Sequence, residues 1–229
     1  MEYCIIIIFL IVLVIMLKYL FGYNKKQIEE IAKNEELDRI AKKYPDNIEM
    51  CKEYLSMLNN KNVTIEEDRT ANSSLYIAIT NKIVIANVKE SFTRIQTIAH
   101  ECLHSIQDRK ILLFNFIYSN IYMLYFIVIS ILKICNILPY EMMFLVILLL
   151  GGFVYYFIRS YLEDDVMIKA RFLAKEYMEN KKISSQEEID KIVKQFDKLN
   201  YLGIKSVNYT LWTTIMVEII IFCGICLIR

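Results

Sequence analysis

The sequence predicts a mainly α-helical membrane protein with four transmembrane helices and a smaller part of helices and strands outside the bilayer. Three observations support this fold class. Hydrophobic residues make up 56% of the 229 residues, whereas soluble domains average about 45–50%. The excess is concentrated in four long apolar runs, and almost all charged residues lie between these runs.

Each apolar run is long enough to cross a bilayer, which takes about 20 residues of helix. The four runs cover residues 1–21, 111–134, 140–158 and 207–228. A cleaved signal peptide is the alternative for the first run. That run is too long for a signal peptide, has no basic start and is not followed by a small-residue cleavage site, so we expect a membrane helix.

The distribution of charge predicts the orientation of the chain in the cell membrane. The hydrophilic segments 22–110 and 159–206 carry 24 of the 27 lysines and arginines, and the link 135–139 has no charge. Basic residues mark the cytoplasmic side of membrane proteins. We therefore expect a multi-pass protein with its N-terminus outside the cell and both charged segments in the cytoplasm.

Composition excludes several other classes of protein. With 27 basic and 26 acidic residues, the chain lacks the excess of positive charge that binds nucleic acid. The 13% of aromatic residues, together with the apolar content, is too high for intrinsic disorder. Six cysteines in a chain of this length do not form the dense disulfide framework of a small secreted protein. The lipid bilayer is thus the expected partner, and oligomerisation stays open.

Periodicity predicts two helices and a hairpin in the first hydrophilic segment. We expect one amphipathic helix over residues 27–43, ending before Pro45, and a second helix over residues 47–58. Residues 75–80 and 82–86 alternate as two strands joined by a turn.

A third helix is expected over residues 91–110, running directly into the second membrane span. Its apolar residues fall on one stripe of the helix surface, and they are Phe92, Ile95, Ala99, Cys102, Leu103 and Ile106. In the second hydrophilic segment we expect helices over residues 159–180 and 185–199.

The two histidines of the chain belong to one motif, His100-Glu101-Cys102-Leu103-His104. Helix positions i and i+4 lie about 40° apart on one face, so both imidazoles can bind one metal ion. Glu101 is rotated by about 100° from His100 and can accept a proton from water at the metal. The alternative is a chance pattern on a solvated helix. Because both histidines lie at the sheltered edge of the apolar stripe, we favour a zinc site.

A zinc site of this kind needs a third protein ligand, which must be a carboxylate or a thiolate because the chain has no third histidine. After residue 110 the chain crosses the membrane twice and returns near Arg159. The acidic cluster of Glu163, Asp164 and Asp165 is therefore expected on the same side of the membrane as the histidines. A solvated helix start is the alternative for such a cluster, and the missing ligand favours metal binding.

The two motifs resemble those of the YugP-type membrane neutral zinc metallopeptidases. Members of that family carry H-E-x-G-H-A-x-Q and, after membrane helices, E-F-D-A-S-x-R-A. This sequence reads H-E-C-L-H-S-I-Q over residues 100–107 and E-D-D-V-M-I-K-A over residues 163–170. The order of parts is also similar, with an N-terminal span, a hairpin, the histidine helix, two spans, the acidic helix and a C-terminal span.

The resemblance implies a zincin-like α+β cytoplasmic part that holds one Zn²⁺ per chain. Glu101 would be the catalytic acid and base, and Asp165, which matches the second acid of the family motif, would orient a ligand histidine through a hydrogen bond. Leu103 stands where the family has glycine, which puts the fine geometry of the site in question. The zinc ligands that the resemblance implies are His100, His104 and Glu163.

These features predict a membrane-anchored zinc endopeptidase that hydrolyses a peptide or protein substrate at the cytoplasmic membrane surface. One strand of the hairpin would pair with an extended substrate, and Tyr161 and Arg171 are candidates for stabilising the oxyanion. Two alternatives stay open. One is a catalytically inactive relative that acts as a membrane scaffold, which the departure at Leu103 favours. The other is a small transporter or channel subunit, which the intramembrane Glu218 suggests.

Overall fold

The computed structural model describes residues 1–68, 70–71, 73–86 and 91–228. About three quarters (75%) of these described residues are helical, and they also form a small sheet of three strands. The chain divides into two compact units. We call them the helical unit (Met1–Tyr23, Phe114–Tyr161 and Lys205–Arg229) and the mixed unit (Asn24–Leu113 and Leu162–Ile204).

Four helices are long and apolar enough to cross a membrane, as the sequence predicts. Each predicted run coincides with part of one of these helices, to within one residue at its start, and their orientation in the membrane stays a prediction. The helices are α1 (Glu2–Phe21), α6 (Arg109–Ile134), α7 (Glu141–Lys181) and α8 (Gln186–Ile228).

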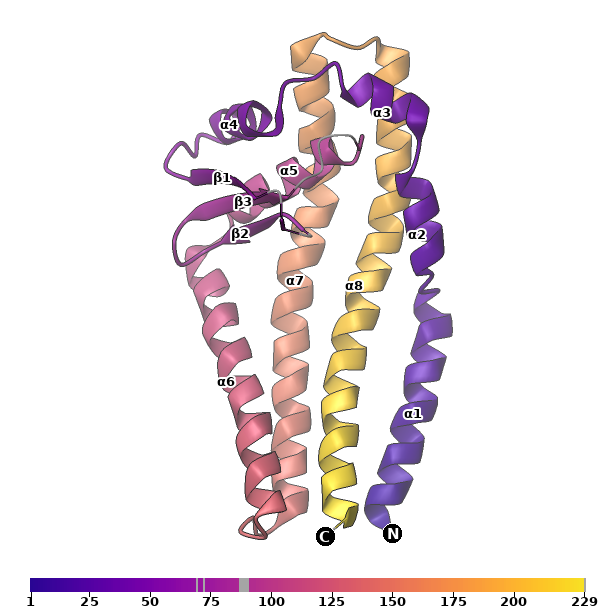
Figure 1. Cartoon of the computed structure of the whole chain (residues 1–229), viewed down its shortest axis with the longest axis vertical. Helices are drawn as coiled ribbons and strands as arrows, with labels where there is room; N and C mark the ends of the chain where they lie inside the picture. Colours follow the sequence, from indigo (N-terminus) through magenta and orange to yellow (C-terminus); the bar gives the residue numbers. More distant parts are fainter. Residues whose placement is uncertain (69, 72, 87–90, 229) are drawn as a thin grey trace. The chain divides into compact units, whose positions relative to one another are not determined.

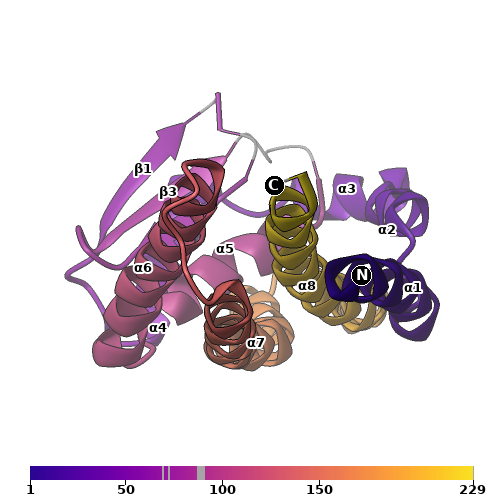
Figure 2. The same cartoon turned by 90° about the horizontal axis from the view of Figure 1, so that it is seen from below.

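In the helical unit these helices run side by side in the order α6, α7, α8, α1 (Figures 1 and 2). The hydroxyl of Tyr118 on α6 donates to the carbonyl of Gly151 on α7 at 3.0 Å. Gly152 lets α7 approach α8 closely, because a Cβ atom there would lie 2.5 Å from the side chain of Ile215. Glu218 is buried among these helices, with 6% of its surface exposed. Small residues and buried polar groups of this kind are typical of helix contacts in membranes.

The sheet of the mixed unit contains the predicted hairpin and one strand that the sequence did not predict. Strand β2 (Leu75–Ile77) pairs antiparallel with β3 (Lys82–Ala86), which confirms the hairpin. Strand β1 (Thr64–Asp68) pairs parallel with β3, so the order is β1-β3-β2. Within the described part of the chain, β2 is therefore an edge strand.

The single helix predicted over residues 27–43 is wrong, because two helices occupy this segment. They are α2 (Lys25–Ala32) and α3 (Glu35–Ala41). Asn34 separates them: its side-chain oxygen accepts a hydrogen bond from the backbone N–H of Leu37 at 3.1 Å and caps α3. Asparagine is a favoured N-cap, so a new helix begins there. The next predicted helix is confirmed as α4 (Asn47–Met57).

The histidine helix also ends earlier than predicted and does not run into the second span. Helix α5 covers Arg94–His104, and α6 begins at Arg109 after a short turn. The Asp108 carboxylate accepts a hydrogen bond from the backbone N–H of Lys110 at 2.8 Å. Asp108 thus starts α6, as aspartate commonly does at a helix N-terminus. Ile106 lies in the turn and is 48% exposed, so it does not belong to the apolar stripe.

Helix α5 lies at the centre of the mixed unit and packs against α4, β2 and β3 (Figure 1). The predicted apolar stripe is buried from Phe92, which lies just before the helix, to Leu103. The second half of α7 and the first half of α8 form an antiparallel pair that contributes Val166, Tyr177 and Phe196 to the same core. Each of these helices is continuous with a predicted membrane span. Helix α7 joins the span at residues 140–158 to the helix predicted over 159–180, and α8 joins the helix predicted over 185–199 to the span at residues 207–228.

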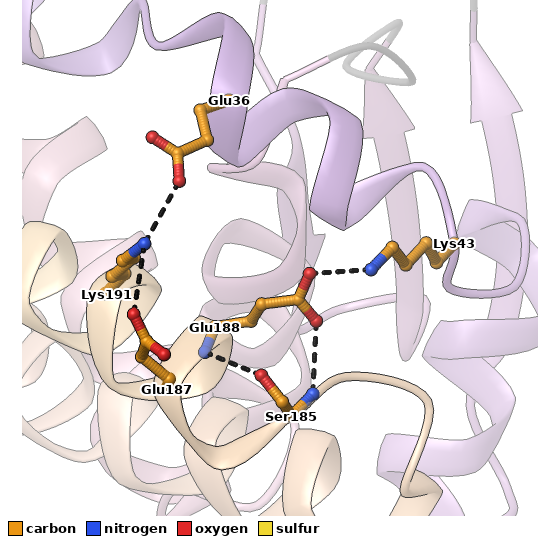
Figure 3. Close-up of polar contacts among 6 residues, drawn as sticks. All are labelled: Glu36, Lys43, Ser185, Glu187, Glu188 and Lys191. Carbon is orange, nitrogen blue, oxygen red and sulfur yellow. Dashed lines mark hydrogen bonds and ion pairs between the residues drawn. The ribbon is translucent and has the colours of Figure 1, made fainter.

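Ion pairs join α3 and its following loop to the start of α8 (Figure 3). Glu36 on α3 accepts from Lys191 on α8 at 3.2 Å. Lys43 donates to Glu188 at 2.7 Å. Glu188 also accepts from the backbone N–H of Ser185, while its own N–H donates to the Ser185 hydroxyl. This reciprocal capping box fixes the N-terminus of α8.

Candidate metal centre

Helix α5 places both histidines of the motif beside each other, as the i, i+4 spacing predicts. The Nε2 atoms of His100 and His104 lie 3.1 Å apart, and the two rings are nearly perpendicular at 81°. The opposite face of α5 is buried in the core. Packing of that face therefore fixes the direction in which the two imidazoles point.

Glu163 on α7 joins the two histidines, although 59 positions separate it from His104. Its Oε2 lies 3.6 Å from Nε2 of His100 and 3.8 Å from Nε2 of His104. The three side chains are 20%, 11% and 12% exposed in the order His100, His104, Glu163. Two imidazoles and a carboxylate with their ligand atoms this close could hold a metal ion.

Glu101 is almost fully buried beside this group, with 7% of its surface exposed. Burial raises the pKa of its carboxyl, and the nearby Glu163 raises it further. Positive charge on His100 or His104 and a hydrogen bond from the backbone N–H of Tyr76 act in the opposite direction. A buried carboxyl whose proton affinity is raised in this way is suited to accept and return a proton.

The pKa of His104 reflects two opposing effects. Burial lowers the pKa, but the nearby carboxylate of Glu163 raises it, with smaller contributions from Glu101 and Gln107, and the net shift is upward. The negative environment that favours a protonated imidazole would equally favour a bound cation. The electrostatics of the site therefore suit a positively charged metal ion.

Gln107 is a residue of the site to which sequence reasoning gave no role. Its side-chain oxygen lies 2.8 Å from Nδ1 of His104, and its side-chain N–H donates to the backbone carbonyl of Leu162 at 2.9 Å. Leu162 directly precedes Glu163 on α7. The spacing of three residues from His104 was the available signal, because helix and turn positions three apart face each other.

The other predicted residues lie in different surroundings. The Asp165 carboxylate pairs with Lys169 one turn further along α7, at 2.6 Å, so its role in orienting a histidine stays a prediction. Arg171 pairs with Asp197 on α8. Cys102 is fully buried, and its sulfur lies 3.5 Å from that of Cys51. Leu103 is part of the same core.

Comparisons with known proteins add no relative for this site. No protein-family model, no curated protein and no solved structure matches the chain. The function is therefore inferred from the residues of the site and from the resemblance of the two motifs.

Proposed function

We propose that the chain is a membrane-anchored, zinc-dependent endopeptidase of the YugP type, with a zincin-like mixed unit. One observation carries the proposal: the two histidines of H-E-x-x-H meet a distant carboxylate, and the glutamate of the motif lies buried next to them. This combination of two histidines, a third acidic ligand and a separate glutamate is the ligand pattern of catalytic zinc in many peptidases.

The three ligand atoms are compatible with zinc, and their chemistry favours it over calcium. They form a triangle with sides of 3.1, 3.6 and 3.8 Å. An ion equally distant from the three corners lies at least about 2.0 Å from each, so zinc–nitrogen and zinc–oxygen bonds of about 2.0–2.2 Å fit the triangle. Calcium prefers oxygen ligands, so the two nitrogen donors favour zinc.

Zinc bound by His100, His104 and Glu163 supplies a Lewis acid that polarises the scissile carbonyl and makes water a better nucleophile. The chain supplies the proton transfers. Glu101 accepts a proton from the attacking water and passes it to the leaving nitrogen of the peptide. Because burial raises the pKa of Glu101, its protonated form is accessible during the cycle.

Strand β2 is the candidate surface for an extended substrate. Its partner on one side is β3, and the backbone N–H of Tyr76 on β2 reaches Glu101. A peptide that added to the other edge of β2 by main-chain hydrogen bonds would run beside the catalytic carboxylate. A peptide or protein substrate would thus be recognised through its backbone.

The test of the function is hydrolysis by the purified full chain in detergent or nanodiscs. Wild type should cleave an unfolded protein or a fluorogenic peptide, and 1,10-phenanthroline should abolish cleavage until zinc is restored. Glu101→Gln should lower the rate by about 10²–10⁴-fold, the contribution of general acid–base catalysis, and should retain bound zinc. Glu176→Gln, an exposed change on α7, is the matched control and should cleave as wild type.

Two results would contradict the proposal in different ways. Zinc-loaded wild type that cleaves no substrate spared by Glu101→Gln would favour the inactive membrane scaffold, for which Leu103 in place of glycine is the sequence argument. Cleavage that persists at full rate in Glu101→Gln would show that the activity does not come from this site.

A further inference from the structure

We propose that Gln107 is a positioning residue that holds His104 as the Nδ1–H tautomer and so presents the lone pair of His104 Nε2 to the metal. This inference rests on the metal-binding part of the proposed function. It assigns a task to a residue whose side chain connects the end of α5 to the helix that carries Glu163.

The backbone carbonyl of Leu162 determines how the side-chain amide of Gln107 is oriented. A backbone carbonyl can only accept, so the 2.9 Å contact commits the side-chain N–H of Gln107 to donate. The amide is thereby oriented with its oxygen toward His104, 2.8 Å from Nδ1. An amide oxygen can only accept, so Nδ1 of His104 carries the proton.

The proton on Nδ1 of His104 determines the protonation of the Nε2 atoms of both histidines. With its proton on Nδ1, neutral His104 has a lone pair on Nε2. That atom lies 3.1 Å from Nε2 of His100, so His100 donates its Nε2 proton to His104 in the metal-free protein. His104 is therefore ready to bind a metal, whereas the proton of His100 must first move from Nε2 to Nδ1, by exchange with water, before its Nε2 can bind.

The same amide couples the two halves of the site. Leu162 and Glu163 are neighbours on α7, and His104 is the last residue of α5. Through Gln107, the ring of one ligand is tied to the helical turn that carries another. Hydrogen bonds of this kind to ligand histidines typically change metal affinity by about 10–100-fold when they are removed.

Two variants separate the two bonds of Gln107. Gln107→Leu keeps the approximate size and removes both hydrogen bonds. Gln107→Glu keeps an oxygen that accepts from Nδ1–H of His104 but loses the donor to Leu162. The matched control is Asn60→Leu, because Asn60 donates to the carbonyl and hydroxyl of Ser105 in the same turn, both at 3.0 Å, without contacting a histidine.

The first measurement is the tautomer of each histidine in the metal-free protein, at an alkaline pH at which both rings are neutral. The chain has two histidines, so long-range ¹H–¹⁵N correlation spectra of ¹⁵N-histidine-labelled protein show two rings. We expect Nδ1–H for His104 and Nε2–H for His100 in wild type, Gln107→Glu and Asn60→Leu, and a mixture at His104 in Gln107→Leu. An Nε2–H tautomer of His104 in wild type would overturn the inference.

The second measurement is the affinity for Zn²⁺, titrated in competition with a chromophoric chelator. Gln107→Leu should bind Zn²⁺ about 10–100-fold more weakly than wild type, Gln107→Glu should bind more tightly than Gln107→Leu, and Asn60→Leu should match wild type. Equal affinity of wild type and Gln107→Leu would overturn the inference. If Gln107→Leu does not fold, the His104 tautomers of wild type and Gln107→Glu still decide. If wild type binds no metal, the proposed function fails, while the tautomers still test Gln107 separately.

Discussion

Arg94 is the buried charge that joins the start of α5 to the end of α3. Only 4% of the surface of Arg94 is exposed. Its guanidinium donates hydrogen bonds to the backbone carbonyls of Ala41, Tyr44 and Pro45 and to the side-chain oxygen of Asn47. Burial lowers the pKa of Arg94, which reflects the cost of keeping a charge there. Hydrogen bonds to the four oxygens offset this cost, and the same oxygens depend on Arg94 as their hydrogen-bond donor.

We predict that Arg94→Leu destabilises the mixed unit by at least about 2 kcal/mol, because it leaves several buried acceptors without a donor. The measurement is amide hydrogen exchange in α3 and α5, which should become faster together. Arg39→Leu is the control, since Arg39 is exposed and donates to Glu35 on the surface of α3. Equal exchange in wild type and Arg94→Leu would contradict this account of Arg94.

At the residue scale, the sequence predicted the ligand group better than its surroundings. The spacing of His100 and His104 determines their common helix face. The even number of crossings predicted the acidic cluster of residues 163–165 on their side of the membrane, and the resemblance of the motifs selected Glu163 from it. Gln107 was missed because its partner on α7 is a backbone carbonyl, that of Leu162, and a backbone group cannot be recognised from the residue type. The hydrogen bonds of Arg94 also end on backbone carbonyls, which a sequence pattern does not reveal.

At the scale of elements, the N-terminus of α8 depends on a charged capping box. Lys43 holds the pKa of Glu188 below its ordinary value of 4.5, and the backbone N–H of Ser185 adds to the effect. The pKa in the unfolded chain is higher than in the folded protein. The stabilisation is therefore fully present above the unfolded value and is lost as the pH falls through the lowered folded value.

We predict that the difference in thermal stability between wild type and Glu188→Gln is largest near neutral pH and disappears on acidification below pH 4.5, the ordinary value. Glutamine still fits the capping box, so the variant removes mainly the charge. The measurement is the Tm of both proteins across this pH range. In a Lys43→Met background the difference near neutral pH should shrink, and an unchanged difference there would contradict the role of Lys43.

The helix boundaries show where periodicity was insufficient. Asn34 and Asp108 begin new helices inside segments whose apolar period continues, so the local caps overrode the pattern. Strand β1 was missed because its sequence, T-I-E-E-D, is acidic and its parallel partner β3 lies 18 positions away. The hairpin was found because its pairing is local.

At the scale of the whole molecule, the balance of lysine and arginine predicts which parts face the cytoplasm. Cys135 lies in the uncharged link and is exposed, and we expect it outside the cell. A cysteine at Asn62 is expected in the cytoplasm. In a Cys4→Ser background, a membrane-impermeant maleimide added to intact cells should label Cys135, whereas Asn62→Cys, tested with Cys135→Ser, should react only after lysis. Labelling of Asn62→Cys in intact cells would reverse the proposed orientation.

In the proposed metal centre, one helix supplies two imidazoles and another supplies a carboxylate to a single divalent ion. The zinc content of the purified full chain, determined by elemental analysis, is the decisive measurement for this arrangement. We predict about one zinc per chain in wild type and Glu176→Ala, in keeping with a three-ligand site, and loss of zinc in His104→Ala and in Glu163→Ala. Full zinc content in folded Glu163→Ala, or its absence from zinc-supplemented wild type, would contradict the account.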